Sequence, residues 1–185
     1  MPIKGQKLEN PATGDVYEFL ETAADTNGKQ VKVRITLKSK GALVPNHIHT
    51  FQDEKFEVLS GHLTVFSEGR KHILISGEAI DLPKGKAHNH YNEHDEPTVY
   101  IQTVSSALDF EHLLETIIGL SRDGKMPNGK AGLVQELVLL RYIDSKSVLA
   151  DIPLGIQKIL LNTVAPIGRF LGYRAVYKKY SGIEK

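Results

Sequence analysis

The chain contains no cysteine, which limits both its cross-links and its metal chemistry. Without thiols there is no disulfide and no thiolate metal site, so nitrogen and oxygen atoms must hold any bound metal. The first residues, 1–6, also lack the apolar core of a secretory signal. Both observations fit a reducing compartment, and we expect a cytoplasmic protein.

An excess of charge of either sign is missing too, because 23 Lys and Arg stand against 22 Asp and Glu. Nucleic-acid-binding domains usually carry a surplus of basic residues, so we expect no nucleic-acid partner. No uncharged apolar run approaches the roughly 20 residues that a membrane-spanning helix needs. The nearest candidate, residues 159–168, is interrupted by Asn162, Thr163 and Pro166.

The 185 residues, 41% of them hydrophobic, allow one domain with a full core or a barrel with a modest appendage. Residues 31–38 give the clearest strand signal, because apolar and polar side chains alternate there. Asn27 and Gly28, just before it, are the pair favoured in tight hairpins. Further strands are expected at residues 16–21, 55–59, 62–66, 71–75, 78–82 and 98–104. Many short strands at this spacing predict an all-β barrel or sandwich.

After the last of these strands, apolar residues follow a helical period instead. Asp109 is placed to cap the first helix, and Pro166 should kink or break the last one. Helices are expected over residues 110–120, from near Ala131, and from Pro153 onward.

The apolar faces of these helices need a covering surface, which is the β domain, another subunit, a membrane surface or a ligand. Amphipathic helices most often serve the core of their own protein. We therefore expect the extension, residues 107–185, to pack on the β domain, residues 1–106, or on a partner subunit. Contact of residues 148–172 with a membrane surface is the less favoured alternative.

A short segment of the β domain carries three metal-ligating side chains, His47, His49 and Glu54. Side chains at positions i and i+2 of a strand point to the same face, so His47 and His49 can aim at one ion. Glu54 follows His49 at an odd spacing, which would place it on the opposite face of an unbroken strand. We therefore expect a bend or bulge within residues 50–53 that returns the carboxylate to the ion.

A second segment completes a recognisable pattern. The first segment reads G-x5-H-x-H-x4-E-x6-G and the second reads G-x5-P-x-G-x2-H-x3-N, with the marked residues Gly41, His47, His49, Glu54, Gly61, Gly77, Pro83, Gly85, His88 and Asn92. Both segments resemble the two signature motifs of the cupin superfamily at every marked position, with residues 62–76 as the spacer. The resemblance covers roughly residues 30–105.

This resemblance implies a mainly β fold, a single cupin barrel of the double-stranded β-helix or jelly-roll type, followed by the C-terminal α-helical extension. It also implies a divalent metal ion held by His47, His49, Glu54 and His88. Three imidazoles and one carboxylate suit Fe, Mn, Ni, Co or Zn, and the sequence does not rank these metals. A homodimer is expected as well, because exposed barrel edges commonly pair in this family.

The motif pair resembles that of cupin dioxygenases, so the favoured function is dioxygenase-type chemistry on a small enolic, phenolic or other oxygen-bearing substrate. Glu54 is then a metal ligand and the candidate catalytic base that accepts the substrate's hydroxyl proton. Phe56, Val58 and Phe66 are expected to line an apolar substrate pocket. His90 is a candidate hydrogen-bond donor to a metal ligand, or a candidate substrate contact, although a packed histidine is the simpler interpretation.

Two other functions remain open at this stage. The first is non-redox catalysis, in which Zn or Mn polarises a carbonyl for isomerisation or hydrolysis. The second is a binding module, in which the barrel holds a small ligand or a structural metal without turnover. Turnover without O2 would favour the first, and persistent ligand binding without turnover would favour the second.

Overall fold

Two antiparallel sheets dominate the computed structural model, which describes residues 2–38, 40 and 44–185. Gly41, the first glycine of the first motif, lies outside these residues. The six-stranded sheet contains, in spatial order, β1 (Lys7–Glu9), β2 (Val16–Glu21), β3 (Gln30–Leu37), β10 (Thr98–Ser105), β5 (Asp53–Ser60) and β8 (Ala79–Leu82). The five-stranded sheet contains β11 (Ser147–Leu149), β4 (His47–His49), β9 (Ala87–Tyr91), β6 (His62–Ser67) and β7 (Arg70–Ile75).

The alternation that predicted a strand at residues 31–38 is confirmed by β3, in which every second side chain is buried. Asn27 and Gly28 both have positive φ angles, 53° and 77°, as the hairpin before β3 requires. β10 lies between β3 and β5 and pairs with both. Local patterning therefore produces the jelly-roll sandwich expected for the first part of the chain.

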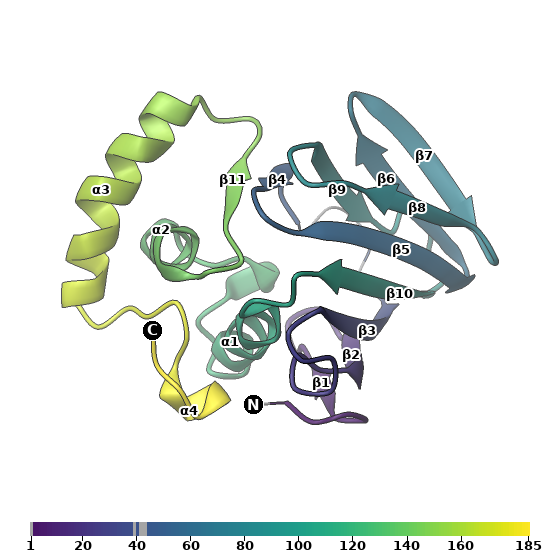
Figure 1. Cartoon of the computed structure of the whole chain (residues 1–185), viewed down its shortest axis with the longest axis horizontal. Helices are drawn as coiled ribbons and strands as arrows, with labels where there is room; N and C mark the ends of the chain where they lie inside the picture. The colour runs from purple at the N-terminus through teal and green to yellow at the C-terminus, as the bar shows by residue number, and fades with distance from the viewer. Residues whose placement is uncertain (1, 39, 41–43) are drawn as a thin grey trace.

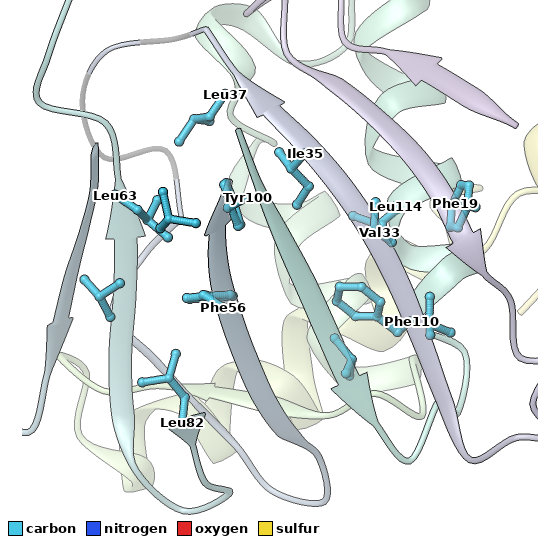
Figure 2. Packing of buried hydrophobic residues seen from close by; sticks show 14 of the residues in the cluster. Phe19, Val33, Ile35, Leu37, Phe56, Leu63, Leu82, Tyr100, Phe110 and Leu114 are labelled. Atoms are coloured by element: carbon cyan, nitrogen blue, oxygen red, sulfur yellow. The ribbon is translucent and has the colours of Figure 1, made fainter. Parts of the chain in front are cut away.

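The hydrophobic core lies between the two sheets. Phe56 on β5, Leu63 on β6 and Tyr100 on β10 are among its fully buried side chains (Figure 2). Phe110 and Leu114 join the same cluster from the helical part of the chain. Burial of these large side chains is the main stabilising term, at roughly 1.5–3 kcal/mol for each one.

The helices gather at one end of the sheets, with α3 outermost (Figure 1). They are α1 (Phe110–Arg122), the short 3-10 helix η1 (Pro127–Gly129), α2 (Leu133–Tyr142), α3 (Leu154–Phe170) and α4 (Lys178–Ser181). All three predicted helices are present. The expected break at Pro166 does not occur, because α3 continues through it to Phe170. Packing of Ala165 and Gly168 against α2 retains the helix despite the missing backbone N–H.

Asp109 precedes α1 as predicted, but its side chain does not cap that helix. It accepts hydrogen bonds from the backbone N–H groups of Asp144 and Ser145 and from Lys185 Nζ instead. The carboxylate thus joins the start of α1 to the segment after α2 and to the C-terminal residue. The local sequence pattern predicted the position of Asp109 before the helix, but it did not predict the hydrogen-bond partners of the Asp109 side chain.

The extension also contains a strand that the sequence did not predict. β11 has only three residues, too few for a periodic signal, and it pairs antiparallel with β4. It therefore becomes the edge strand of the five-stranded sheet, beside the strand that carries two of the candidate metal ligands (Figure 1). Residues after 106 are not only a covering layer but also complete one of the sheets.

The apolar face of α3 is covered only on one side. Its buried Ala165 and Gly168 face α2, whereas Ile156, Ile159, Ile167 and Phe170 are exposed, Phe170 to 90%. The packing of the whole extension, residues 107–185, on the β domain, residues 1–106, or on a partner subunit stays a prediction. In the part of the chain that the structure describes, no helix combines the length and apolar character needed to cross a bilayer.

Candidate metal centre

The chain leaves one sheet and enters the other between the two parts of the first motif. β4 ends at His49 in the five-stranded sheet, and β5 begins at Asp53 in the six-stranded sheet. The predicted bend is therefore confirmed, and it turns Glu54 back towards the two histidines. Gln52 fastens this bend, because its buried side-chain amide donates a hydrogen bond to the backbone carbonyl of Ser106 at 2.7 Å.

The second motif meets the first across a strand pair. His88 on β9 is the register partner of His47 on β4. One ligand atom from each of His47, His49, Glu54 and His88 lies within 4.8 Å of every other. His47 Nε2 is 3.0 Å from His49 Nε2, and the two Glu54 oxygens are each 3.2 Å from a histidine Nε2. The four predicted ligands thus converge on one point.

The outer nitrogens of two histidines show which ring atom faces this point. His47 Nδ1 lies 2.9 Å from the carbonyl oxygen of Pro45, and His88 Nδ1 lies 3.1 Å from that of Lys86. A carbonyl oxygen only accepts, so each Nδ1 carries the proton and donates it. Nε2 is therefore the nitrogen of each ring that faces the centre, and in the neutral ring it carries the lone pair that a metal ligand requires.

Glu54 is buried and fully engaged. Its Oε1 accepts a hydrogen bond from Gln102 Nε2 at 2.9 Å. Burial raises the pKa of Glu54, but the hydrogen bonds from His49 and His88 and the positive charge of His49 and His47 outweigh it and hold the pKa well below its usual range. The carboxylate therefore keeps its negative charge at neutral pH, which favours a cation beside it.

The histidines differ in how their surroundings affect protonation. Burial lowers the pKa of His47 to about 4, despite attraction from Glu54. Burial also acts to lower the pKa of His88, but the hydrogen bond with Glu54, the charge of Glu54 and the hydrogen bond to the Lys86 carbonyl together outweigh burial and raise the pKa. Without a metal, the proton of this cluster therefore resides nearer His88 than His47.

These distances agree with a shared cation. Two donors that each lie about 2.1 Å from one ion, at right angles, are about 3.0 Å apart. The adjacent donors of this cluster are separated by 3.0 to 3.2 Å. A set of nitrogen and oxygen donors without sulfur suits Fe, Mn, Ni, Co or Zn, so the residues fit the divalent metal expected from the sequence.

Comparison with known proteins supports the resemblance seen in the motifs. Residues 33–104 match the family model described as a cupin domain. The chain contains a cupin domain. A search of curated proteins finds no significant match. The subfamily of this cupin domain is therefore not identified.

Solved structures similar to this chain include other cupins. A sugar phosphate isomerase of the cupin superfamily from Silicibacter pomeroyi DSS-3 is 21% identical, with a TM-score of 0.45 over 52% of this chain and 62% of the other. KdgF from a Halomonas species is 19% identical, with a TM-score of 0.49 over 57% and 91%. An RmlC-like cupin from Shewanella frigidimarina NCIMB 400 is 17% identical, with a TM-score of 0.48 over 60% and 94%.

Among the predicted pocket residues of the cupin domain, Phe56 and Val58 share the inward face of β5 with Glu54. Both belong to the buried core cluster. Phe66 does not line this interior, and that prediction is wrong. It is 36% exposed and opposes Asn89 on β9, whereas the neighbouring Val65 opposes His90. Successive side chains of a strand alternate faces, so Phe66 points away from the metal-binding side.

His90 is packed inside the cupin domain between two aromatic rings. Its Nε2 lies 2.9 Å from the hydroxyl oxygen of Tyr100, and its ring centroid lies 4.6 Å from that of Phe56. Burial lowers its pKa to about 4, so the ring is neutral. Its Nδ1 is buried without a hydrogen-bond partner. The packed-histidine interpretation describes these contacts, and a contact with substrate stays a prediction.

Two other marked positions of the motifs, Asn92 and Gly61, shape turns. The side chain of Asn92 bonds the backbone of His94 and Glu96, which ties down the turn that follows β9 as expected. Gly61 has a φ of 77°, and a Cβ there would lie 2.7 Å from the carbonyl oxygen of Pro97. No other residue fits at this position without a backbone shift.

Sequence reasoning missed two side chains that contact the ligands. Gln102 holds Glu54 from β10, and Ser147 Oγ lies 3.1 Å from His49 Nδ1 on β11. Gln102 did carry a signal, because it is a polar residue between Tyr100 and Val104 on the inward face of its strand. Ser147 carried none, since its place beside His49 depends on a strand pairing 98 residues away in the sequence.

Proposed function

We propose that the cupin domain binds one divalent metal through His47, His49, Glu54 and His88, and that it is a metal-dependent enzyme of the dioxygenase type. The observation that carries the proposal is the convergence of the histidine Nε2 atoms on the Glu54 carboxylate. The outward Nδ1–H groups of His47 and His88, each donated to a carbonyl, support it. Histidines that only pack against one another would not require that each ring carry its proton on Nδ1 and turn Nε2 to the same point.

The chemistry requires an ion and a substrate oxygen close together. When bound, a divalent metal supplies a Lewis acid for an enolate or phenolate oxygen and, if it is redox-active, an electron path between the substrate and O2. His47 is the partly exposed member of the four, whereas His49, Glu54 and His88 are buried. We therefore place substrate entry on the His47 side of the centre.

Glu54 is the proposed catalytic base as well as a ligand. Its depressed pKa keeps the carboxylate unprotonated, in the form that can accept a hydroxyl proton from the substrate. Gln102 holds Oε1, while Oε2 faces His88. The apolar interior beside Glu54, formed in part by Phe56 and Val58, suits a small substrate with few charges.

The test compares two glutamates of the same strand. Glu54→Ala should abolish O2 consumption by metal-reconstituted protein with catechol or pentane-2,4-dione as phenolic and enolic probes, and the fold should remain. Glu57→Gln is the matched control, because Glu57 lies on the outer face of β5, away from the four ligands, and pairs with Lys55 at 3.0 Å. Full activity in the Glu54→Ala variant would refute the assignment.

A non-redox isomerase or hydrolase is the second candidate, because the same nitrogen and oxygen donors suit Zn and Mn. Anaerobic assays distinguish it, since turnover without O2 excludes the dioxygenase proposal. A third candidate is a module that binds a small ligand without reaction, because the same cluster of donors could hold a metal whether or not turnover follows. Stable binding of a small acid with no turnover under either atmosphere would support that candidate.

A further inference from the structure

We propose that Ser147 is a positioning residue for the metal centre, through which the C-terminal extension fixes the orientation and tautomer of His49. The inference rests on the proposed metal binding. Ser147 Oγ lies 3.1 Å from His49 Nδ1, and Ser147 and His49 are register partners in the β11–β4 pair. A residue outside the matched cupin segment, 33–104, thus contacts one of the candidate ligands.

His49 differs from the other two histidines in the source of its outer hydrogen bond. His47 and His88 each bond the carbonyl two residues earlier in their own strand, which is a local contact. His49 depends on Ser147, a residue 98 positions later. A serine hydroxyl can accept from Nδ1–H, which leaves the Nε2 lone pair for an ion shared with Glu54 and His47. Ser147 thereby supplies what a main-chain carbonyl supplies for the other rings.

The position of Ser147 is fixed by backbone contacts along β4. Thr50 N donates to the carbonyl of Lys146 at 3.0 Å, and Ala150 N donates to the carbonyl of Asn46 at 2.9 Å. The Thr50 hydroxyl donates to the same Lys146 carbonyl at 2.9 Å. These bonds on both sides of the pair prevent Ser147 from sliding away from His49.

The first turn of α3 holds β11 from its other side. Gln157, a buried residue of α3, accepts a hydrogen bond from Leu149 N at 3.0 Å through its side-chain oxygen. Its side-chain nitrogen donates to the carbonyl oxygens of Leu149 and Ile152, at 2.8 and 2.6 Å. The folded extension therefore fixes the position of the Ser147 hydroxyl. Hydrogen bonds run from Gln157 of α3 to Leu149 of β11, and from Ser147 of β11 to the candidate ligand His49.

The experiment compares Ser147→Ala, Ser147→Thr and the control Thr50→Val. Thr50→Val removes a hydrogen bond across the same strand pair, but one that touches no histidine. Loss of an outer hydrogen bond to a metal ligand typically costs 10–100-fold in metal affinity, so Ser147→Ala should bind Zn(II) and Co(II) roughly 10–100-fold more weakly. Ser147→Thr keeps the hydroxyl and should restore affinity to within about threefold of wild type, which Thr50→Val should also match.

Two further readouts separate positioning from general stability. The Co(II) absorption spectrum should change in Ser147→Ala and not in Thr50→Val. In the metal-free protein, the nitrogen NMR shifts of the His49 ring should show mixed tautomers in Ser147→Ala, with His47 and His88 unchanged. Metal binding by Ser147→Ala with wild-type affinity and spectrum would overturn the role of Ser147 alone. Absence of metal binding by the wild type would overturn it together with the proposed function.

Discussion

Gln102 donates a hydrogen bond of 2.9 Å to Glu54 Oε1, which joins β10 to the ligand on β5 inside the core. Both side chains are buried, so the amide replaces a water molecule that the carboxylate would otherwise need. The bond leaves Glu54 one fixed orientation relative to His49 and His88.

We predict that Gln102→Leu weakens metal binding roughly 10–100-fold, because the ligand carboxylate loses its outer partner. Calorimetric titration with Zn(II) measures the change. Thr103→Val is the matched control, since Thr103 neighbours Gln102 on β10 and its buried hydroxyl has no partner. Equal affinity in Gln102→Leu and the wild type would show that the orientation of Glu54 does not depend on this amide.

Asp109 gives a prediction about acid stability. Burial raises its pKa, but hydrogen bonds from the backbone N–H groups of Asp144 and Ser145 and from the Lys185 side chain outweigh burial and lower it. A lowered folded-state pKa adds stability above the unfolded value, near pH 4, and this stability is lost as pH falls through the folded value. Asp109→Asn should therefore lower the free energy of unfolding by about 1–3 kcal/mol at pH 7.

The pH dependence of this variant provides the check. Urea unfolding at pH 7 and at pH 3 should show that the difference between the wild type and Asp109→Asn shrinks at the lower pH, because the wild-type carboxyl is then protonated more often. A difference that stays constant across this range would mean that the charge of Asp109 is not the stabilising feature.

Two glycines of α3 should respond in opposite ways to alanine. A Cβ at Gly168 would lie 2.6 Å from Val134 Cγ1 and 2.9 Å from Val138 Cγ2 on α2, whereas a Cβ at Gly155 meets nothing within 4 Å. Gly168→Ala should destabilise the protein by about 1–3 kcal/mol through overpacking. Gly155→Ala should stabilise it by up to about 1 kcal/mol through helix propensity.

Thermal unfolding of the two alanine variants measures this contrast. Gly168→Ala should melt below the wild type and Gly155→Ala at or above it. If Gly168→Ala melts with the wild type, the close packing of α3 on α2 is not present in solution.

The homodimer expected from the sequence stays a prediction, and the edge strand β7 is where we expect it. β7 ends the five-stranded sheet, and its Ile73 and Ile75 side chains are about half exposed. An apolar edge strand is a template for pairing with another chain. Light scattering should give about twice the chain mass of 20.5 kDa, and Ile73→Lys should reduce it to one chain. A monomeric wild type would contradict this prediction.

The sequence predicted those features that depend on neighbouring residues. The alternation in residues 31–38 gave β3, and the odd spacing between His49 and Glu54 predicted the bend that returns the carboxylate. The resemblance to cupin motifs then brought His88 into the same cluster. These features need no knowledge of which strand pairs with which.

Features that depend on long-range pairing were not predictable in the same way. Phe66 was assigned to the interior because its register with β9 is invisible in the sequence, and a shift of one residue reverses the face. β11 and Ser147 were missed for a similar reason, since three residues gain strand geometry only by pairing with β4. The α3 helix continues through Pro166 because of packing on α2, a tertiary effect that local propensity does not contain.

Metal content of freshly purified protein tests whether the four donors form a real site. Elemental analysis by plasma mass spectrometry should find close to one divalent transition metal per chain in the wild type and almost none in His88→Ala. His94→Ala, which alters an exposed histidine in the turn after β9, should keep the wild-type content. A wild type that neither retains a metal nor takes one up on reconstitution, or a His88→Ala variant with full metal content, would contradict the account.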